Sequence, residues 1–417
     1  MSASSRRTNT TFAALRVRNF RLYMSGQVIS VSGSWMQAVA QGWLVLQLTG
    51  SPVGLGVAVA LQNLPTMFFG FYGGLVADRL DKRKILYATQ SVAGVLALTL
   101  GLLVTTHHVT VMSVYVLAGL LGVVNLFDMP ARHSFVQQMV GRELIPNAVS
   151  LNSAIMNSGR LIGPSLAAGL IVIVGMAVCF YANALSYVAV IVALSMMRTD
   201  ELLPMKSVDR QRGQLRMGIK YVASSPLLRN TILSAAVVGT FAFNFAVYLP
   251  LLARVTFHQR SATEYGLLMG AMGLGAVIGG LFVAHRSRPT PKLLATLALG
   301  FGVFLTLVGL APSLLWAEVA LVPTGAFSLA FISTSNASLQ IHSSEQMRGR
   351  VMSLFGTAVF GTVPVGSLLM GLIIGATTPR FGIVFSAALT LGIGVALIAT
   401  YHQNVRSTLE LQGAFAD

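Results

Sequence analysis

Long stretches without charged side chains alternate along this chain with short clusters of lysine and arginine. Residues 22–77 contain no Asp, Glu, Lys or Arg, and an α-helix needs about 20 residues to cross a bilayer. Two membrane-spanning helices therefore fit in this first stretch. The helix-ending sequence Thr49-Gly50-Ser51-Pro52 is expected to separate them.

The later uncharged stretches predict further spans by the same count. Paired spans are expected to break near His107 and His108, near Gly175, at Pro312 and near Arg380. We expect two spans each in 85–127, 144–197, 293–344 and 351–404, and one span each in 231–253 and 265–284. The pattern predicts an all-α polytopic membrane protein with twelve transmembrane helices.

The distribution of basic residues predicts which helix ends face the cytoplasm, because cytoplasmic loops carry the excess of Lys and Arg. With both termini and every second loop in the cytoplasm, only four of the 28 basic residues fall elsewhere, namely Arg160, Arg254, Arg260 and Arg380. The longest polar segment, 198–229, is then a cytoplasmic linker. We expect six-helix bundles at 1–197 and 230–405 and a cytoplasmic tail at 406–417.

Composition supports a protein embedded in lipid. The chain is 54% hydrophobic and 10% charged, whereas soluble domains carry about 25% charged residues. Its net charge of +16 follows from the cytoplasmic loops, and no aromatic-basic platform for nucleic acid is present. There is one cysteine, Cys179, and we find no metal-ligand spacing, no ATP-binding Gly-x-x-x-x-Gly-Lys motif and no nucleophile-base set. We expect no enzyme activity, no cofactor and no metal site.

An internal repeat relates the two halves. Gly73-Gly74-Leu75-Val76-Ala77-Asp78-Arg79 ends the second predicted span, and Gly279-Gly280-Leu281-Phe282-Val283-Ala284-His285-Arg286 ends the eighth. Two parallel halves suit a transporter in which the halves rock about a midplane site.

Polar residues on the first predicted span form one stripe. Gln27, Ser30, Ser34, Gln37 and Gln41 follow steps of three and four residues, so they share a helix face. Such a stripe does not face lipid cheaply. It lines a water-accessible cavity, which we favour, or makes hydrogen bonds to other helices.

Arg160 is expected near the bilayer midplane of span five, where a guanidinium is expensive. It either contacts an anion or substrate or acts as a conformational switch, or it is satisfied structurally by carbonyls, Asn157 and a neighbouring helix; the sequence leaves these alternatives open. Gly159, Gly163 and Pro164 beside it predict close helix packing and a kink. Asn244 and Asn336 are further candidates for the substrate cavity.

The loop at 78–84 is dense in both signs of charge after a Gly-Gly helix end. Positive-inside topology explains its basic residues but not the carboxylate of Asp78 at the membrane edge. We expect Asp78 to cap an adjacent helix while pairing with arginine.

These features together resemble the major facilitator superfamily over nearly the whole chain. The segment from Gly74 to Lys84 resembles its signature between the second and third helices, with Asp81 where glycine is usual. Four further segments resemble the enterobactin-exporter-like branch, the transmembrane secretion effectors: the run 43–52, Pro130-Ala131-Arg132, Arg160-Leu161-Ile162-Gly163-Pro164 and Arg348-Gly349-Arg350-Val351-Met352-Ser353.

The resemblance implies export of siderophores, drugs or other small amphipathic metabolites by proton antiport, from a protein of the bacterial cytoplasmic membrane that we expect to act as a monomer. It implies that helices one, four, seven and ten line the cavity, and that Gly74, Asp78, Arg79 and Arg83 belong to a gating loop. Asp78 is then the acid that holds the cytoplasmic side closed against span eleven.

Proton coupling departs from the pattern of many drug antiporters, because span one has no acid and Ala118 stands where an arginine is expected in span four. The candidate proton carriers are Asp128 and Glu318. For Asp128 we favour a gate role, paired with the region of Arg79 or Arg83. Competing interpretations are a facilitator that imports a solute and a membrane receptor or accessory protein that transports nothing.

Overall fold

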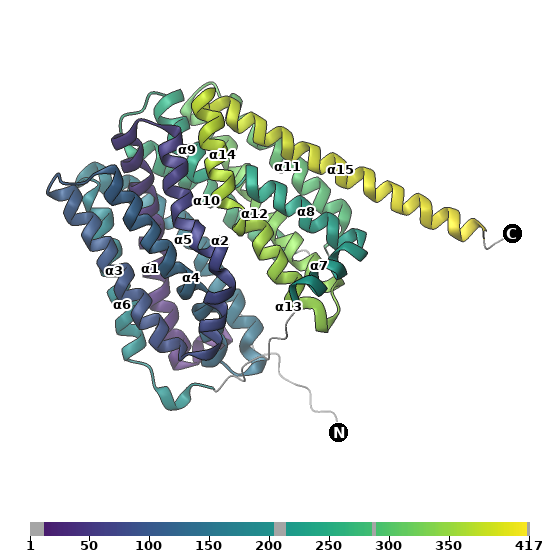
Figure 1. Ribbon diagram of the computed structural model, residues 1–417, viewed down its shortest axis with the longest axis horizontal. Helices are drawn as coiled ribbons and strands as arrows, with labels where there is room; N and C mark the ends of the chain where they lie inside the picture. Colours follow the sequence, from purple (N-terminus) through teal and green to yellow (C-terminus); the bar gives the residue numbers. More distant parts are fainter. Residues whose placement is uncertain (1–11, 204–213, 286–288, 415–417) are drawn as a thin grey trace. The chain divides into compact units, whose positions relative to one another are not determined.

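Every regular element in the part of the chain that the structure describes is a helix (Figure 1). The computed structural model describes residues 12–203, 214–285 and 289–414. The α-helices are α1 Arg18–Thr49, α2 Pro52–Arg79, α3 Lys82–Thr105, α4 Val111–Met139, α5 Ile145–Ile173, α6 Ala177–Ser195, α7 Gln214–Ser224, α8 Pro226–Phe241, α9 Phe245–Leu251, α10 Ala262–His285, α11 Pro291–Leu310, α12 Leu314–His342, α13 Glu345–Gly356, α14 Val363–Ala376 and α15 Pro379–Ala414. Short 3-10 turns are η1 Ala13–Arg16, η2 Arg142–Leu144 and η3 Thr199–Glu201, and two π-helical segments are η4 Leu252–Thr256 and η5 Thr357–Gly361.

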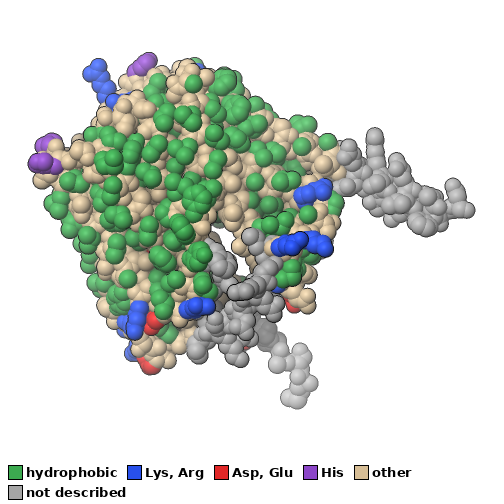
Figure 2. Space-filling model, viewed as in Figure 1, with side chains coloured by type: hydrophobic (Ala, Val, Ile, Leu, Met, Phe, Trp, Pro, Cys, Tyr) green, Lys and Arg blue, Asp and Glu red, His purple; other side chains and the backbone are tan. Residues whose placement is uncertain are grey.

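Eleven helical segments within the described residues are long and apolar enough to cross a membrane. Helix α1 is not among them, although its 32 residues exceed the length of a bilayer crossing. Its stripe of Gln and Ser side chains lowers its hydropathy. The multi-pass membrane fold is therefore shown, whereas the twelfth span, α1, stays a prediction. On the face drawn in Figure 2, hydrophobic side chains are spread over the whole described surface and charged ones are few.

The turns between paired helices lie where the sequence predicts them. Helix α1 ends and α2 begins around Gly50, which has φ +60°, and α5 and α6 meet at Gly175, which has φ +100°. Glycine adopts this left-handed region without the steric cost that a Cβ brings. His107, with φ 59°, makes the corresponding turn between α3 and α4.

The helices group into two compact units. Unit 1 comprises residues Met1–Gln41 and Leu64–Asp209, and unit 2 comprises Gly42–Asn63 and Arg210–Asp417. In unit 1, α3 packs on α4 and α6, and in unit 2, α10 packs on α12 and α11 on α12 and α15. The bundle boundaries at 1–197 and 230–405 stay a prediction. The expected linker at 198–229 contains η3, α7 and the start of α8, and its residues 204–213 lie outside the described ranges.

A glycine of the internal repeat allows close contact between two helices in each unit. In unit 1, a methyl group on Gly73 of α2 would overlap the carbonyl of Leu126 in α4. In unit 2, a methyl group on Gly279 of α10 would overlap the carbonyl of Ala326 in α12. Missing Cβ atoms thus let one helix backbone touch the next at equivalent places in the two halves, as in small-residue packing of membrane helices.

Unit 2 also contains two interrupted spans. The single span expected at 231–253 lies within the candidate span Pro226–Thr256, and the helix of this span is interrupted. Helix α8 ends at Phe241, α9 begins at Phe245, and the π-helical η4 follows. The other runs from α13 through the π-helical η5 to α14. Hydropathy does not register such interruptions, because residues on both sides of the break are apolar.

Candidate functional site

An ion pair lies inside unit 1, in the middle of a helix that sequence reasoning treated as ending there. Asp128 and Arg132 both belong to α4, one helical turn apart, and they form a salt bridge. The side chain of Asp128 is 6% exposed and that of Arg132 17% exposed. Removing two charges from water costs several kcal/mol per ion unless they are paired and hydrogen-bonded.

Neighbouring helices supply the hydrogen bonds that this pair requires. Thr89 and Gln90 of α3 each donate to the Oδ1 atom of Asp128 over 2.7 Å. Arg132 donates to the side-chain oxygen of Gln27 on α1. Tyr23 of α1 lies close enough to interact electrostatically with both charges, and its ring packs edge-on against Phe135, 5.8 Å between centroids. One carboxylate and one guanidinium therefore connect α1, α3 and α4.

This geometry corrects the partner expected for Asp128, which was the region of Arg79 or Arg83. Arg79 is exposed at the end of α2. Arg83 instead donates from Nε and Nη2 to the backbone carbonyl of Leu194, over 3.0 and 2.7 Å, near the C-terminal end of α6. A cation favours the negative end of a helix dipole. Arg83 thus joins α3 to α6.

The loop between α2 and α3 ends in an acidic N-cap. Asp81, which stands where the family usually has glycine, accepts hydrogen bonds from the backbone amides of Arg83 and Lys84 over 2.9 and 3.3 Å. It is therefore the N-cap of α3. The side chain of Asp78 lies outside the described residues, and both its capping role and its gating role stay predictions. Gly74 lies in the last part of α2.

The stripe on α1 makes interhelical contacts at two of its five positions. Gln27 accepts from Arg132, and Gln37 accepts from the side-chain amide of Asn183 in α6 over 2.7 Å. Ser34 donates to the carbonyl of Ser30, one turn earlier in the same helix. The remaining stripe residues are buried: Ser30 is 1% exposed and Gln41 is 7% exposed.

Arg160 lies in the middle of α5, and its guanidinium stacks on the ring of Trp35 in α1, 5.3 Å from the ring centroid. Two glycines bring these helices together. A Cβ atom on Gly159 would collide with Val31, and one on Gly163 would lie 2.5 Å from the carbonyl oxygen of Ser32 and from Cβ of Trp35. Pro164 follows within the same helix. The sequence motif at 159–164 thus fixes the position of Arg160 against α1.

The three candidates in unit 2 lie apart along their helices. Asn244 occupies the break between α8 and α9, is 2% exposed, and donates to the carbonyl of Thr240 over 2.6 Å while its Oδ1 atom has no hydrogen-bond partner. Asn336 in the second half of α12 accepts a hydrogen bond from Gln340. Glu318 is half-buried in the second turn of α12.

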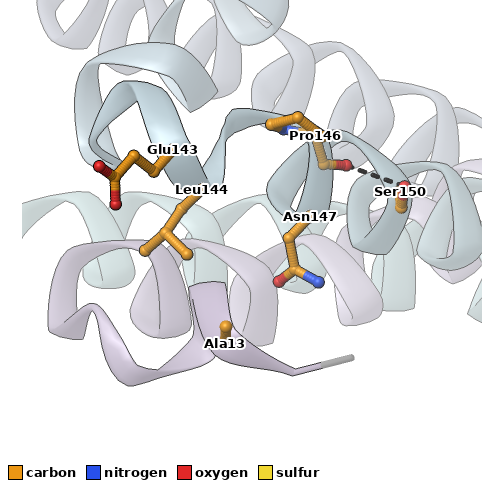
Figure 3. Close-up of a pocket in the computed structure, with 6 residues that line it drawn as sticks. All are labelled: Ala13, Glu143, Leu144, Pro146, Asn147 and Ser150. Carbon is orange, nitrogen blue, oxygen red and sulfur yellow. Dashed lines mark hydrogen bonds between the residues drawn. The ribbon is translucent and has the colours of Figure 1, made fainter. Parts of the chain in front are cut away.

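A hollow of about 330 Å³ lies elsewhere in unit 1, between η1 and the start of α5. Figure 3 shows its lining, in which Pro146 accepts a hydrogen bond from Ser150. The residues around it are Ala13, Glu143, Leu144, Pro146, Asn147 and Ser150. None of the residues predicted for the site lines it. Among the described residues, no three His, Cys, Asp or Glu side chains are grouped so as to hold a metal ion.

Sequence reasoning missed the residues that contact Asp128 and Arg160. Arg132 was assigned to a cytoplasmic loop, although its spacing of four from Asp128 is the spacing of an ion pair on a helix. Thr89, Gln90 and Trp35 carried no such local signal, because their partners lie on other helices.

Comparison with known proteins matches this chain along nearly its full length. The sequence profile of a family described as transmembrane secretion effectors matches residues 9–412. The chain is 25% identical to a multidrug efflux pump of Mycolicibacterium fortuitum, covering 87% of this chain and 90% of the pump. It is 24% identical to the staphyloferrin A transporter of Staphylococcus aureus, covering 94% and 97%. It is 26% identical to the enterobactin exporter of Shigella flexneri, covering 91% and 90%.

Solved transporter structures share the fold at lower identity. A bacterial homologue of the human lysosomal transporter Spinster, in an inward-facing and unoccupied conformation, superposes with a TM-score of 0.67 at 15% identity, covering 98% of this chain and 99% of that one. A POT family transporter in complex with a thioalcohol-conjugated peptide superposes with a TM-score of 0.72 at 11% identity, covering 93% and 96%.

Proposed function

Because the chain belongs to the transmembrane secretion effector family of the major facilitator superfamily, we propose that it exports small amphipathic molecules by proton antiport. The substrate is a siderophore, drug or metabolite that crosses by alternating access of two halves. Relatives of similar length that export enterobactin or act as a multidrug efflux pump support the direction of transport.

The buried Asp128–Arg132 pair is the observation that carries the proton-coupling part of this proposal. The described residues form two salt bridges, and this one is buried. The other, Arg198 with Glu201, is exposed. A proton on Asp128 cancels its charge, and Arg132 then keeps its bond to Gln27 of α1 without a counter-ion on α4. Proton binding therefore changes the forces between α1, α3 and α4, as coupling of a proton to a helix rearrangement requires. Glu318 is the second candidate carrier.

The test is flux in everted membrane vesicles under an imposed pH gradient, with ethidium as a cationic probe and 8-anilinonaphthalene-1-sulfonate as an anionic one. We expect Asp128→Asn to reduce gradient-driven uptake by about tenfold or more, equivalent to about 1.4 kcal/mol or more of lost coupling. Glu201→Gln is the matched control, since it removes an acid from the exposed salt bridge. Uptake by Asp128→Asn equal to the control, at equal protein in the membrane, would remove Asp128 as the proton carrier.

Topology and gating complete the proposal. Both termini face the cytoplasm, α1 is the twelfth span, and the protein works as a monomer in the bacterial cytoplasmic membrane. The cluster of basic residues at 79–84 supports this orientation. In the gating loop, Asp78 holds the cytoplasmic side closed. Reporter fusions at 107 and 204–213 should read outside and inside, respectively.

A further inference from the structure

Arg160 carries a positive charge at the centre of a membrane-spanning helix and has no acidic partner among the side chains that the structure describes. The described residues form two salt bridges, and neither uses Arg160. A charge at the bilayer centre costs about 3 kcal/mol even on lenient scales, and such residues face a protein interior or a water-filled cavity. The cation–π contact with Trp35 offsets part of this cost. A negative charge is the group that would offset the remainder.

Arg160 lies where α5 packs closely against α1, and the residue is half-buried. Gly159 and Gly163 bring the backbone of α5 against Val31 and Ser32 of α1. Both Arg160 and Trp35 are nevertheless only half-buried. A guanidinium presents a planar fork that matches a carboxylate or sulfonate, and it is held here in place by an aromatic face. Ordering costs on binding an anion are therefore small.

We propose that Arg160 and Trp35 form a subsite for the acidic group of an amphipathic substrate whose aromatic or apolar part lies against the indole ring. This inference rests on the proposed function and adds the substrate class, an organic anion such as an aromatic carboxylate or sulfonate. An anionic lipid headgroup has the same chemistry, but headgroups lie about 15 Å from the bilayer centre, and Arg160 belongs to the middle of the 29-residue α5.

A pair of probes that differ by one charge tests the subsite. 8-Anilinonaphthalene-1-sulfonate and N-phenyl-1-naphthylamine share a fluorophore, and only the first carries a sulfonate. The chain has three tryptophans, so a Trp43→Phe/Trp316→Phe protein reports energy transfer from Trp35 alone. We expect the purified full-length protein in detergent to bind the sulfonate more tightly than the neutral probe by about tenfold or more, although the neutral probe is the more hydrophobic.

Variants at Arg160 then assign the preference to this residue. Arg160→Gln should weaken sulfonate binding by roughly tenfold to a hundredfold, the effect of one lost charge-assisted contact, and change the neutral probe less than about twofold. Arg160→Lys keeps the charge on the same backbone and should lose less affinity, because only the fork geometry is removed. Equal affinities of the two probes in the parent protein, or equal losses for both probes in either variant, would overturn the subsite. The parent measurement decides even where a variant does not fold.

Two further measurements complete the test. One distinguishes a substrate from a lipid headgroup as the source of the anion, and the other separates the subsite from the proposed export function. Competition by liposomes of phosphatidylglycerol, without competition by free 1-naphthalenesulfonate, would assign the site to a lipid headgroup and overturn the substrate subsite. Glu201→Gln, which changes only the exposed salt bridge, should bind the sulfonate like the parent protein. Arg160-dependent binding in a parent protein without gradient-driven flux would refute the export proposal and leave the anion subsite standing.

Discussion

Replacing Arg132 by glutamine leaves the carboxylate of Asp128 among helices without a counter-charge. Breaking a buried ion pair from one side costs about 3–5 kcal/mol, because the remaining charge stays desolvated. The two 2.7 Å hydrogen bonds from Thr89 and Gln90 remain and still stabilise the carboxylate. We therefore expect Arg132→Gln to lower the free energy of unfolding by about 3 kcal/mol, the lower end of this range.

Removing the second charge as well should restore most of this loss. In Asp128→Asn/Arg132→Gln, two neutral amides replace the pair, and replacing both partners of a buried ion pair is often close to neutral. The double variant should therefore be more stable than Arg132→Gln alone, with a coupling of about 2 kcal/mol in the double-mutant cycle. Denaturation in lipid–detergent mixed micelles, followed by tryptophan fluorescence, measures each corner of the cycle.

The exposed pair of Arg198 and Glu201 provides the control for this cycle, since its side chains are 60% and 38% exposed. Arg198→Gln should leave the unfolding midpoint unchanged, because solvent screens such pairs. If the double variant is as unstable as Arg132→Gln alone, the buried charges are not coupled and the argument that Asp128 transmits protonation through Arg132 fails.

Two other predictions concern helix packing and the hydrogen bond between Ser344 and Tyr221. Gly73→Ala and Gly279→Ala should each destabilise the protein by about 1–3 kcal/mol, because the new methyl meets a carbonyl of the neighbouring helix. Gly119→Ala is the control, since its methyl would meet no neighbouring atom within 4 Å. Equal melting temperatures for the three variants would contradict the packing argument. The backbone amide of Ser344 donates to the Tyr221 hydroxyl over 3.1 Å and lowers the pKa of that phenol. An ultraviolet difference titration of the parent against Tyr221→Phe should therefore show a phenol with a pKa below the ordinary tyrosine value. The stability that the ionised phenol contributes should be present at alkaline pH and be lost as the pH falls through its folded-state pKa. A difference curve centred at the ordinary tyrosine pKa would refute the hydrogen bond.

Charge spacing predicted the multi-pass fold, because placing a charge in lipid is costly and the charges are visible in the local sequence. Helix-ending residues inside the uncharged stretches predicted the turns at Gly50, His107 and Gly175. The charge spacing placed the end of span four too early. Helix α4 continues to Met139, so Arg132 is a helical residue facing Asp128. Pro130 lies inside α4, and membrane helices tolerate proline where neighbours satisfy the freed carbonyl.

The contacts of the site depended on tertiary structure and could not be read from the chain alone. Arg160 was identified by its charge, but its partner Trp35 lies on α1, far away in sequence. The polar stripe on α1 was recognised from its period, whereas the hydrogen bond from Asn183 to Gln37 depends on how α6 packs against it. Periodicity identifies a polar face, and only packing decides what meets it.

The segment Gly42–Asn63, which belongs to unit 2, limits how this chain can be divided. A methyl on Gly56 would lie 2.5 Å from the carbonyl oxygen of Ser367, and one on Gly42 would lie 3.5 Å from the ring of Tyr265. A fragment that ends at Asp209 would separate this helical hairpin, Gly42–Asn63, from Ser367 and Tyr265. Gly42 and Gly56 would then lack their packing partners. Split expression of the gene should therefore require both fragments to be synthesised together, since the hairpin of the first completes the fold of the second.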